Sequence, residues 1–299
     1  EKSVNAYNTL KDWGMQALIG TTTSTPCTAV VEETHSDNMF QLTPSATAVD
    51  SIQYDNAFRM CFSDPNQGSA SADYIAENKL ATKVAIIYNS SDTYSSGIYQ
   101  TFATEAKAKG LDVVAAEAFT ADNKTDFSVQ IQKAKDAGAE LVFLPIYYQE
   151  ASLILAQANK AGFTPKWFGC DGMDGILDLE GFDANLAEDL MFLTPFTANA
   201  TDEATQKFVA DYKEAFGDTP IQFAADAYDA IYVIKAAIEE SNVTPDMSVS
   251  DICEGLKAAM VKISVDGLTG EGMTWTADGE PNKAPKAVKI VDGAYAAME

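Results

Sequence analysis

KVAIIYNSSDTYSSGIYQTFATEAKAKGLDVVAAEAF, residues 83–119, is the stretch that decides the fold class. It opens with a short apolar, β-branched run, residues 83–89, which predicts a strand buried on both faces. Residues 96–109 place apolar side chains at helical spacing, and Gly110 is a typical helix end. Residues 111–119 are a second apolar run and predict the next strand. The stretch therefore predicts a strand–helix–strand unit.

The same alternation extends over most of the chain. It predicts α/β architecture with doubly wound parallel sheets and right-handed crossovers. Glycine-rich turns in the tail, such as ADGEP and VDG, predict antiparallel hairpins instead. Two α/β lobes joined by several short crossings fit this order. The further predicted strands are 15–20, 38–44, 140–146 and 166–172, and the further predicted helices are 126–138, 149–162, 202–216 and 222–241.

The charge of the chain excludes some classes of partner. The 299 residues include 44 acidic and 20 basic side chains, which gives a formal net charge of −24. Nucleic-acid binding needs a basic face, so this class is disfavoured. The same charge disfavours docking on an anionic membrane and favours a monomer. No apolar run approaches the roughly 18 residues that a membrane span needs.

The sequence offers little catalytic chemistry. Cys27, Cys61, Cys170 and Cys253 form no close pair, so no zinc or redox motif is supported, and single buried thiols are favoured over any disulfide. His35 is the only histidine, and the polar sequence around it predicts a solvated loop. The motifs of serine hydrolases, zinc proteases, P-loops and dinucleotide-binding folds are missing. We therefore predict no enzyme activity, no metal and no cofactor.

Polar and aromatic residues follow the predicted strands, where ligands sit in open α/β sheets. Hydroxyl groups and amides at helix N-termini suit a carboxylate, and a lone carboxylate suits an ammonium group. Tyrosines add an apolar wall with a polar tip. Together they predict a site for a zwitterion. The residues are Ser24 in TTTST, the TPSATA segment with Thr47, Tyr94, the pair Tyr147 and Tyr148, and Asp171 before Gly172.

Each of these residues also has an ordinary structural interpretation. Ser24 can cap the helix that begins near Pro26, and Thr47 can be a turn residue. Asp171 can be a turn former, and the tyrosines can be core residues with satisfied hydroxyls. Only the joint placement of the residues favours a ligand site.

The chain resembles the periplasmic binding proteins of the leucine/isoleucine/valine type, the extracellular receptors of amino-acid ABC transporters. The resemblance runs over essentially the whole chain and depends on the order and spacing of several strings. These are KSVNAYNTLKDWGMQALIG, TPSATA, FRMCFSDPNQG, AIIYNSSDTYSSG, TDFSVQIQKAK, FLPIYYQEA, FGCDGMD, FAADAYDAIY and LTGEGMTW.

The resemblance implies a role for each candidate residue. The ligand's α-carboxylate is expected at one lobe and its α-ammonium group at the other, with further residues lining the cleft between them. The implied residues are Ser24, Ser45, Ala46 and Thr47 for the carboxylate, Asp171 and Tyr147 for the ammonium group, Tyr94 for the cleft and Phe223 for the side-chain pocket.

The resemblance also implies the organisation and the partner. One lobe is expected to hold residues 1–62 and 196–275, and the other residues 63–195 and 276–299. Ligand binding would close the lobes, and an ABC transporter permease would recognise the closed form. The implied location is extracytoplasmic, either in the periplasm or on a lipid anchor at the outer face of the cytoplasmic membrane. Family members begin with a further strand–helix–strand segment, whereas this chain opens in the helix EKSVNAYNTLKDWG, so that segment is expected to be missing.

Two other functions stay open at this point. The same fold serves as the ligand-sensing domain of receptors and regulators, in which closure signals instead of delivering a ligand. An α/β enzyme is the third possibility, and the single histidine argues against it.

Overall fold

A computed structural model describes residues 1–298, and the contacts within the chain divide it into two units. Unit 1 holds residues 1–63 and 223–284, and unit 2 holds residues 64–222 and 285–299. This division differs for residues 196–222 and 276–284 from the lobes that the resemblance implies, and those lobes stay a prediction. The hinge positions themselves stay a prediction. Within residues 1–298, no helix has both the length and the apolar character of a membrane span.

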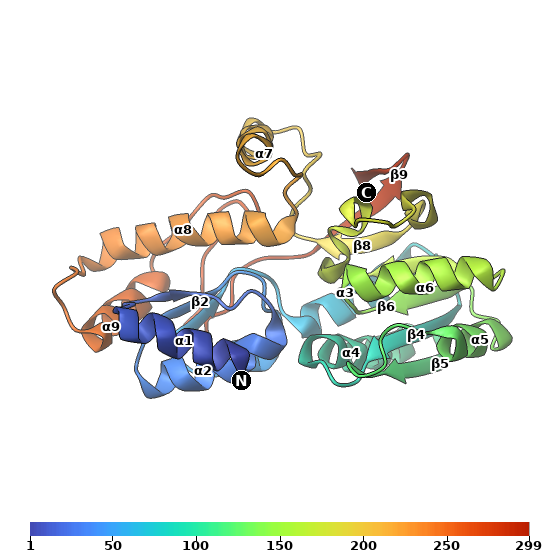
Figure 1. The fold of residues 1–299 in the computed structure, drawn as a ribbon, viewed down its shortest axis with the longest axis horizontal. Coiled ribbons are helices and arrows are strands. Elements are labelled where there is room, and N and C mark those ends of the chain that lie inside the picture. The colour runs from blue at the N-terminus through green and yellow to red at the C-terminus, as the bar shows by residue number, and fades with distance from the viewer. Residues whose placement is uncertain (299) are drawn as a thin grey trace. The chain divides into compact units, whose positions relative to one another are not determined.

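Unit 1 is built on a three-stranded parallel sheet in the order β1-β2-β3 (Figure 1, left). Helix α8 begins at Gln222, the last residue of unit 2, and continues through unit 1. The elements are α1 (Lys2–Trp13), β1 (Leu18–Ile19), α2 (Ser24–Ser36), β2 (Gln41–Thr43), η1 (Val49–Ile52), β3 (Ala57–Arg59), α8 (Gln222–Ser241) and α9 (Val249–Met260).

Two helix pairs cover the two faces of this sheet. Phe40, Leu42 and Phe58 pack with apolar residues of α8 and α9 in one core cluster. A smaller cluster joins α1 and α2 through Tyr7 and Val30. The apolar residues of β2 and β3 are at most 1% exposed, as expected of a sheet with helices on both sides, whereas Ile19 of β1 is partly exposed.

Unit 2 is built on a seven-stranded sheet in the order β10-β9-β8-β7-β6-β4-β5. Strands β5, β4, β6, β7 and β8 run parallel, and the C-terminal hairpin of β9 and β10 adds two antiparallel strands. The strands are β4 (Lys83–Asn89), β5 (Asp112–Phe119), β6 (Leu141–Leu144), β7 (Lys166–Gly169), β8 (Met191–Thr194), β9 (Lys286–Val291) and β10 (Ala294–Ala297). The helices are α3 (Asp64–Glu77), α4 (Thr93–Ala108), α5 (Ser128–Asp136), α6 (Tyr148–Lys160), η2 (Asp171–Met173), η3 (Ile176–Asp178), η4 (Ala184–Ala187) and α7 (Glu203–Phe216).

Unit 2 has three layers (Figure 1, right). Alternate residues of β6 point to opposite faces, so Leu141 and Phe143 pack with α3 and α4, while Val142 and Leu144 pack with α5 and α6. Helices α4 and α6 follow the neighbouring strands β4 and β6 and cover opposite faces. The sheet therefore has its topological switch point between β4 and β6, where ligands bind in such folds.

Local sequence explains where the helices begin and end. The Asp202 carboxylate accepts a hydrogen bond from the backbone N–H of Thr205 and caps α7, and this bond lowers the pKa of Asp202. Ser248 caps α9 in the same way. Gly217 ends α7 with a φ of 78°, a left-handed conformation that favours glycine.

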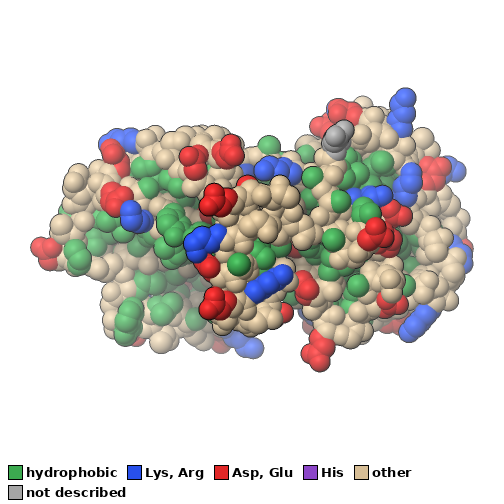
Figure 2. Space-filling view, turned by 90° about the horizontal axis from the view of Figure 1, so that it is seen from above, with side chains coloured by type: hydrophobic (Ala, Val, Ile, Leu, Met, Phe, Trp, Pro, Cys, Tyr) green, Lys and Arg blue, Asp and Glu red, His purple; other side chains and the backbone are tan. Residues whose placement is uncertain are grey.

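The α/β class, the parallel sheets and the antiparallel tail hairpin agree with the sequence predictions. All four cysteines are buried and free, as predicted. His35 is exposed, as predicted, but the predicted loop was wrong: it lies in the last turn of α2, with its ring stacked on Tyr54 at 3.9 Å between ring centroids. Figure 2 shows acidic and basic side chains interspersed on one face of the molecule.

Candidate functional site

In unit 1, the Ser24 hydroxyl joins the start of α2 to the segment that follows β2. Ser24 Oγ accepts hydrogen bonds from the backbone N–H groups of Thr47 and Ala48, both at 3.2 Å. Ser24 is the first residue of α2, and the N-cap position belongs to Thr23. The Ser24 hydroxyl therefore bonds to the segment after β2 and does not cap its own helix, while the predicted ligand contact stays a prediction. Because Oγ accepts twice, the hydroxyl proton of Ser24 remains available for another acceptor.

Thr47 is fully buried, and its hydroxyl has no hydrogen-bond partner within residues 1–298. The backbone around it is held firmly, because the Arg59 guanidinium donates to the Thr47 carbonyl and Ala46 N–H donates to Thr43 Oγ1 at 3.2 Å. An unsatisfied buried hydroxyl is costly and uncommon. Thr47 therefore has a free polar group beside the start of α2.

Ser45 belongs to a buried polar network that the sequence did not reveal. Ser45 Oγ donates to Asp226 Oδ2 at 2.8 Å, and Asp226 is fully buried in α8. Lys283 Nζ lies 4.0 Å from the other Asp226 oxygen and donates to Thr269 Oγ1 at 2.6 Å. Thr269 in turn donates to Asp229 at 2.7 Å. The Ser45 proton is thus committed to Asp226, so the Ser45 hydroxyl cannot donate to a ligand at the same time.

In unit 2, Asp171 is the centre of the candidate site. It lies in η2 after β7, and only 2% of it is exposed. Oδ1 accepts from the Tyr94 hydroxyl at 2.7 Å, and Oδ2 accepts from Gln222 Nε2 at 3.0 Å. The backbone N–H of Asp171 donates to Gln67 Oε1 at 3.1 Å. These neutral groups fix both the side chain and the backbone of Asp171.

Burial dominates the electrostatics of Asp171. It raises the pKa of the carboxyl group, and the hydrogen bonds from Tyr94 and Gln222 partly oppose this increase. Burial and the Asp171 charge also raise the Tyr94 pKa well above its ordinary value, so the phenol stays protonated and donates. A positive ligand group beside Asp171 would favour the charged carboxylate.

The side chains of Tyr147 and Tyr148, at the start of α6, pack in different core clusters. Strand β6 ends at Leu144, so the pair lies in the helix entry and not on the strand as predicted. Tyr147 is the N-cap residue, and its ring stacks on Tyr94 at 4.7 Å between centroids. Tyr148 packs against the core on the opposite face of the sheet. The two side chains therefore lie on different faces of the sheet, as predicted, while the contact of Tyr147 with a ligand stays a prediction.

Gly172 is required by the close approach of both tyrosines. A Cβ atom at this position would lie 2.8 Å from the Tyr94 hydroxyl and 3.0 Å from Tyr147 Cδ1. The Gly172 N–H also donates to the Tyr94 hydroxyl at 3.0 Å. Any side chain here would displace the rings that hold Asp171.

The candidate residues of unit 2 thus gather at one edge of its sheet. Tyr94, Tyr147 and Asp171 follow β4, β6 and β7, which are neighbours in the sheet. Phe223 is half-buried in the first turn of α8 and belongs to unit 1. The sequence missed Gln222, Gln67, Asp226 and Lys283, because nothing in one sequence relates these residues to partners so distant along the chain.

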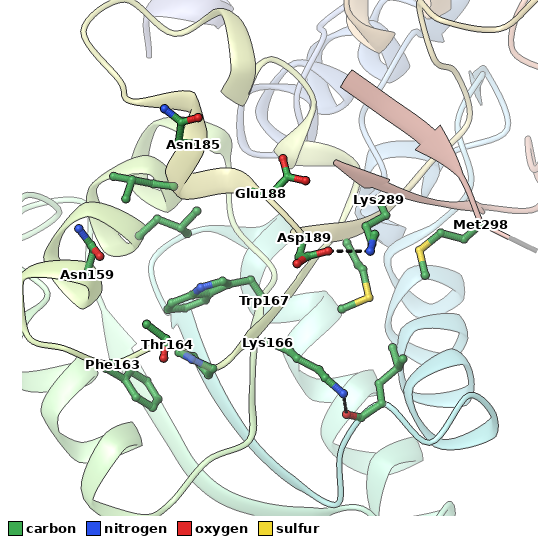
Figure 3. A pocket seen from close by; sticks show the side chains of 15 residues that line it. Asn159, Phe163, Thr164, Lys166, Trp167, Asn185, Glu188, Asp189, Lys289 and Met298 are labelled. Carbon is green, nitrogen blue, oxygen red and sulfur yellow. Dashed lines mark hydrogen bonds and ion pairs between the residues drawn. The ribbon is translucent and has the colours of Figure 1, made fainter. Parts of the chain in front are cut away.

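Unit 2 also contains a cavity of about 630 Å³ at the opposite edge of its sheet (Figure 3). None of the predicted site residues lines it. Its charged groups already have partners, since Lys289 Nζ donates to Asp189 at 2.6 Å and Lys166 Nζ donates to the Leu80 carbonyl at 2.6 Å. The Trp167 ring lies among apolar side chains in its wall.

Polar groups at the carboxyl edge of a doubly wound parallel sheet are the arrangement of α/β ligand-binding proteins. The chain belongs to the periplasmic binding protein family, whose profile matches residues 1–294. Leu/Ile/Val-binding protein homolog 3 of Brucella melitensis is 28% identical over 251 residues, which are 82% of this chain and 66% of that protein.

Two solved structures extend the comparison. The leucine-binding protein LivK of Thermotoga maritima has a TM-score of 0.87 and 25% identity, covering 99% of this chain and 83% of that one. The branched-chain amino acid binding protein LivJ of Streptococcus pneumoniae, solved with isoleucine, has a TM-score of 0.83 and 26% identity, covering 98% of this chain and 81% of that one.

Proposed function

We propose that this chain captures an α-amino acid, branched-chain or otherwise apolar, and delivers it to an ABC transporter. The observation that carries the proposal is Asp171, a buried carboxylate held by the neutral groups of Tyr94 and Gln222. A ligand ammonium group would supply the positive charge that such a carboxylate favours. Tyr147, stacked beside Tyr94, offers its ring face to the same ammonium group.

The ligand carboxylate is assigned to unit 1. Ser24 has a hydroxyl proton to donate, and Thr47 has a buried hydroxyl without a partner within residues 1–298. Ser24 begins α2, where the helix dipole favours an anion, and the Thr47 N–H is hydrogen-bonded to the Ser24 hydroxyl. Because the Ser45 hydroxyl donates to Asp226, Ser45 and Ala46 would contribute backbone groups instead. This segment would therefore hold the carboxylate without a basic side chain.

Similarity to named relatives supports the apolar side chain. The Brucella melitensis relative is named for leucine, isoleucine and valine, and the Streptococcus pneumoniae structure contains isoleucine. Phe223 would form part of the wall for such a side chain. Delivery to a permease and an extracytoplasmic location, in the periplasm or on a lipid anchor, follow from the same family membership and are part of the proposal.

A thermal-shift panel of the twenty common amino acids tests this function. We expect L-leucine, L-isoleucine or L-valine to raise the melting temperature, because a ligand at about 100 times its Kd stabilises a protein by about 2.7 kcal/mol. 4-Methylpentanoate lacks the ammonium group of leucine, and isopentylamine lacks its carboxylate. Both should give no shift at the same concentration. If no amino acid produces a shift, the proposed function is wrong.

A further inference from the structure

We propose that Gln222 is a positioning residue, which holds the Asp171 carboxylate for the ligand's ammonium group and ties it to the end of β8. The inference rests on the proposed function, because it takes Asp171 as the ammonium partner. Gln222 is the first residue of α8 and is fully buried. It occupies the point where the chain leaves unit 2 for unit 1.

Three hydrogen bonds fix Gln222 within unit 2. Its side-chain Nε2 donates to Asp171 Oδ2 at 3.0 Å. Its Oε1 accepts from the hydroxyl of Thr194, the last residue of β8, at 3.3 Å. Its backbone N–H donates to Asp174 Oδ2 at 2.5 Å. One residue thus connects Asp171, the end of a strand and the first turn of α8.

The orientation of the amide follows from its two partners. Reversing it would place Oε1 beside a carboxylate oxygen of Asp171, where two acceptors repel each other. The Thr194 hydroxyl has one proton, which it shares between Gln222 Oε1 at 3.3 Å and the Phe196 carbonyl at 2.9 Å, so its position is fixed from both sides. Thr194 therefore keeps Nε2 of Gln222 directed at Asp171.

The groups around Asp171 explain why the side-chain amide of Gln222 matters for the charge of the Asp171 carboxylate. The titratable groups around it include Tyr94 from α4, Tyr147 from the start of α6, Cys170 and Asp174 from the chain around η2, and buried Asp64 from α3, which acts on Cys170. Burial raises the pKa values of Asp171, Asp174 and Cys170, because it disfavours the charged form of each group. The Gln222 amide lowers the pKa of Asp171. Without it, the carboxylate would protonate at a higher pH and lose its attraction for an ammonium group.

The test measures L-leucine binding by calorimetry in wild-type protein and in Gln222→Met, at several pH values from about 5.5 to about 8. Methionine keeps the length of glutamine but cannot donate, and the backbone bond to Asp174 remains. We expect affinity to fall about tenfold or more at neutral pH, and to fall further with decreasing pH than in wild type. Gln206→Met, which changes an exposed glutamine of α7, is the matched control and should leave affinity and pH profile unchanged.

Thr194→Val provides a second variant if Gln222→Met does not fold. It removes the hydroxyl that orients the amide but leaves Gln222 itself. We expect a smaller loss of affinity with the same dependence on pH. Wild-type affinity and an unchanged pH profile in the folded variants would overturn the role of Gln222 while leaving the proposed function intact. Absence of L-leucine binding in wild type, with no other amino acid bound, would overturn both.

Discussion

The Tyr94 hydroxyl donates to Asp171 Oδ1 at 2.7 Å and accepts from the Gly172 N–H at 3.0 Å. Tyr94 is only 1% exposed, so its main contact is with Asp171 and not with solvent. The resemblance implied a tyrosine that lines the ligand cleft. That role stays a prediction. Within unit 2, the Tyr94 hydroxyl holds the Asp171 carboxylate, and the Tyr147 ring stacks on the Tyr94 ring.

Tyr94→Phe should therefore weaken both folding and binding. The change leaves Asp171 Oδ1 without this donor, and a hydrogen bond to a charged group contributes about 1.5–3 kcal/mol. We expect urea unfolding to show a loss of that size, and calorimetry to show weaker amino-acid binding. Tyr148→Phe is the control, because Tyr148 packs against the other face of the sheet. Equal effects of the two substitutions would contradict the role given to Tyr94.

Thr47→Val should separate binding from stability. The Thr47 hydroxyl is buried without a partner within residues 1–298, so its removal should leave the free energy of unfolding unchanged or raise it by up to about 1 kcal/mol. Affinity for the amino acid should nevertheless decrease, because the carboxylate loses a donor. Chemical unfolding of the Thr47→Val variant measures the free energy of unfolding, and calorimetry of the same variant measures its affinity for the amino acid.

Thr34→Val is the matched control for Thr47. Its hydroxyl is also fully buried, but it donates to Gln41 Oε1 at 2.6 Å and accepts from Asn56 Nδ2 at 3.2 Å. This substitution should destabilise unit 1 by about 1–3 kcal/mol. A Thr47→Val variant that is destabilised as much as Thr34→Val would show that Thr47 has a structural role.

Lys283→Met should destabilise unit 1. The Lys283 side chain is only 3% exposed, donates to Thr269 and lies 4.0 Å from Asp226, so its loss leaves a buried carboxylate without its cation. Breaking such a pair costs about 3 kcal/mol or more. Lys235→Met removes an exposed ion pair with Glu239 and should change stability by less than about 1 kcal/mol. Similar unfolding curves for the two variants would refute the importance of the buried network.

Asp174→Asn should change the pH dependence of stability. Burial raises the pKa of Asp174 to about 7, above its unfolded value of 3.8. Between these values the native state binds more protons at this group than the unfolded state, so its contribution to stability falls as pH rises. Asparagine still accepts the Gln222 N–H but does not titrate. The stability difference between variant and wild type should grow in favour of the variant from about pH 4.5 to about pH 7.5 in urea titrations. A difference that stays constant with pH would contradict the raised pKa.

The sequence predicted the α/β elements well where apolar periodicity was strong. Strand β4 has the predicted bounds, and α6 carries Ala151, Ile154, Leu155 and Ala158 at the spacing of one buried face. Short elements such as β1, with two residues, contain too little pattern for their bounds to be read. The exposure of His35 was anticipated, but its helix was not, because polar residues in a last helical turn look like a loop.

Only some of the residues that build the candidate site could be predicted from the sequence. Residues directly after strands, such as Tyr94 and Asp171, could be predicted because parallel strands bring their carboxyl ends together. The supporting residues could not. Ser45 and Asp226 are 181 positions apart, and Gln222 and Asp171 are 51 apart, so only the folded chain pairs them.

The most direct test is calorimetric titration of L-leucine into wild-type protein and Asp171→Ala, with the exposed Asp136→Ala as control. The proposed function predicts that Asp171→Ala weakens binding by at least about 2 kcal/mol, because the buried ammonium group loses its charged partner, while Asp136→Ala binds as wild type does. Unchanged affinity in a folded Asp171→Ala protein would contradict it.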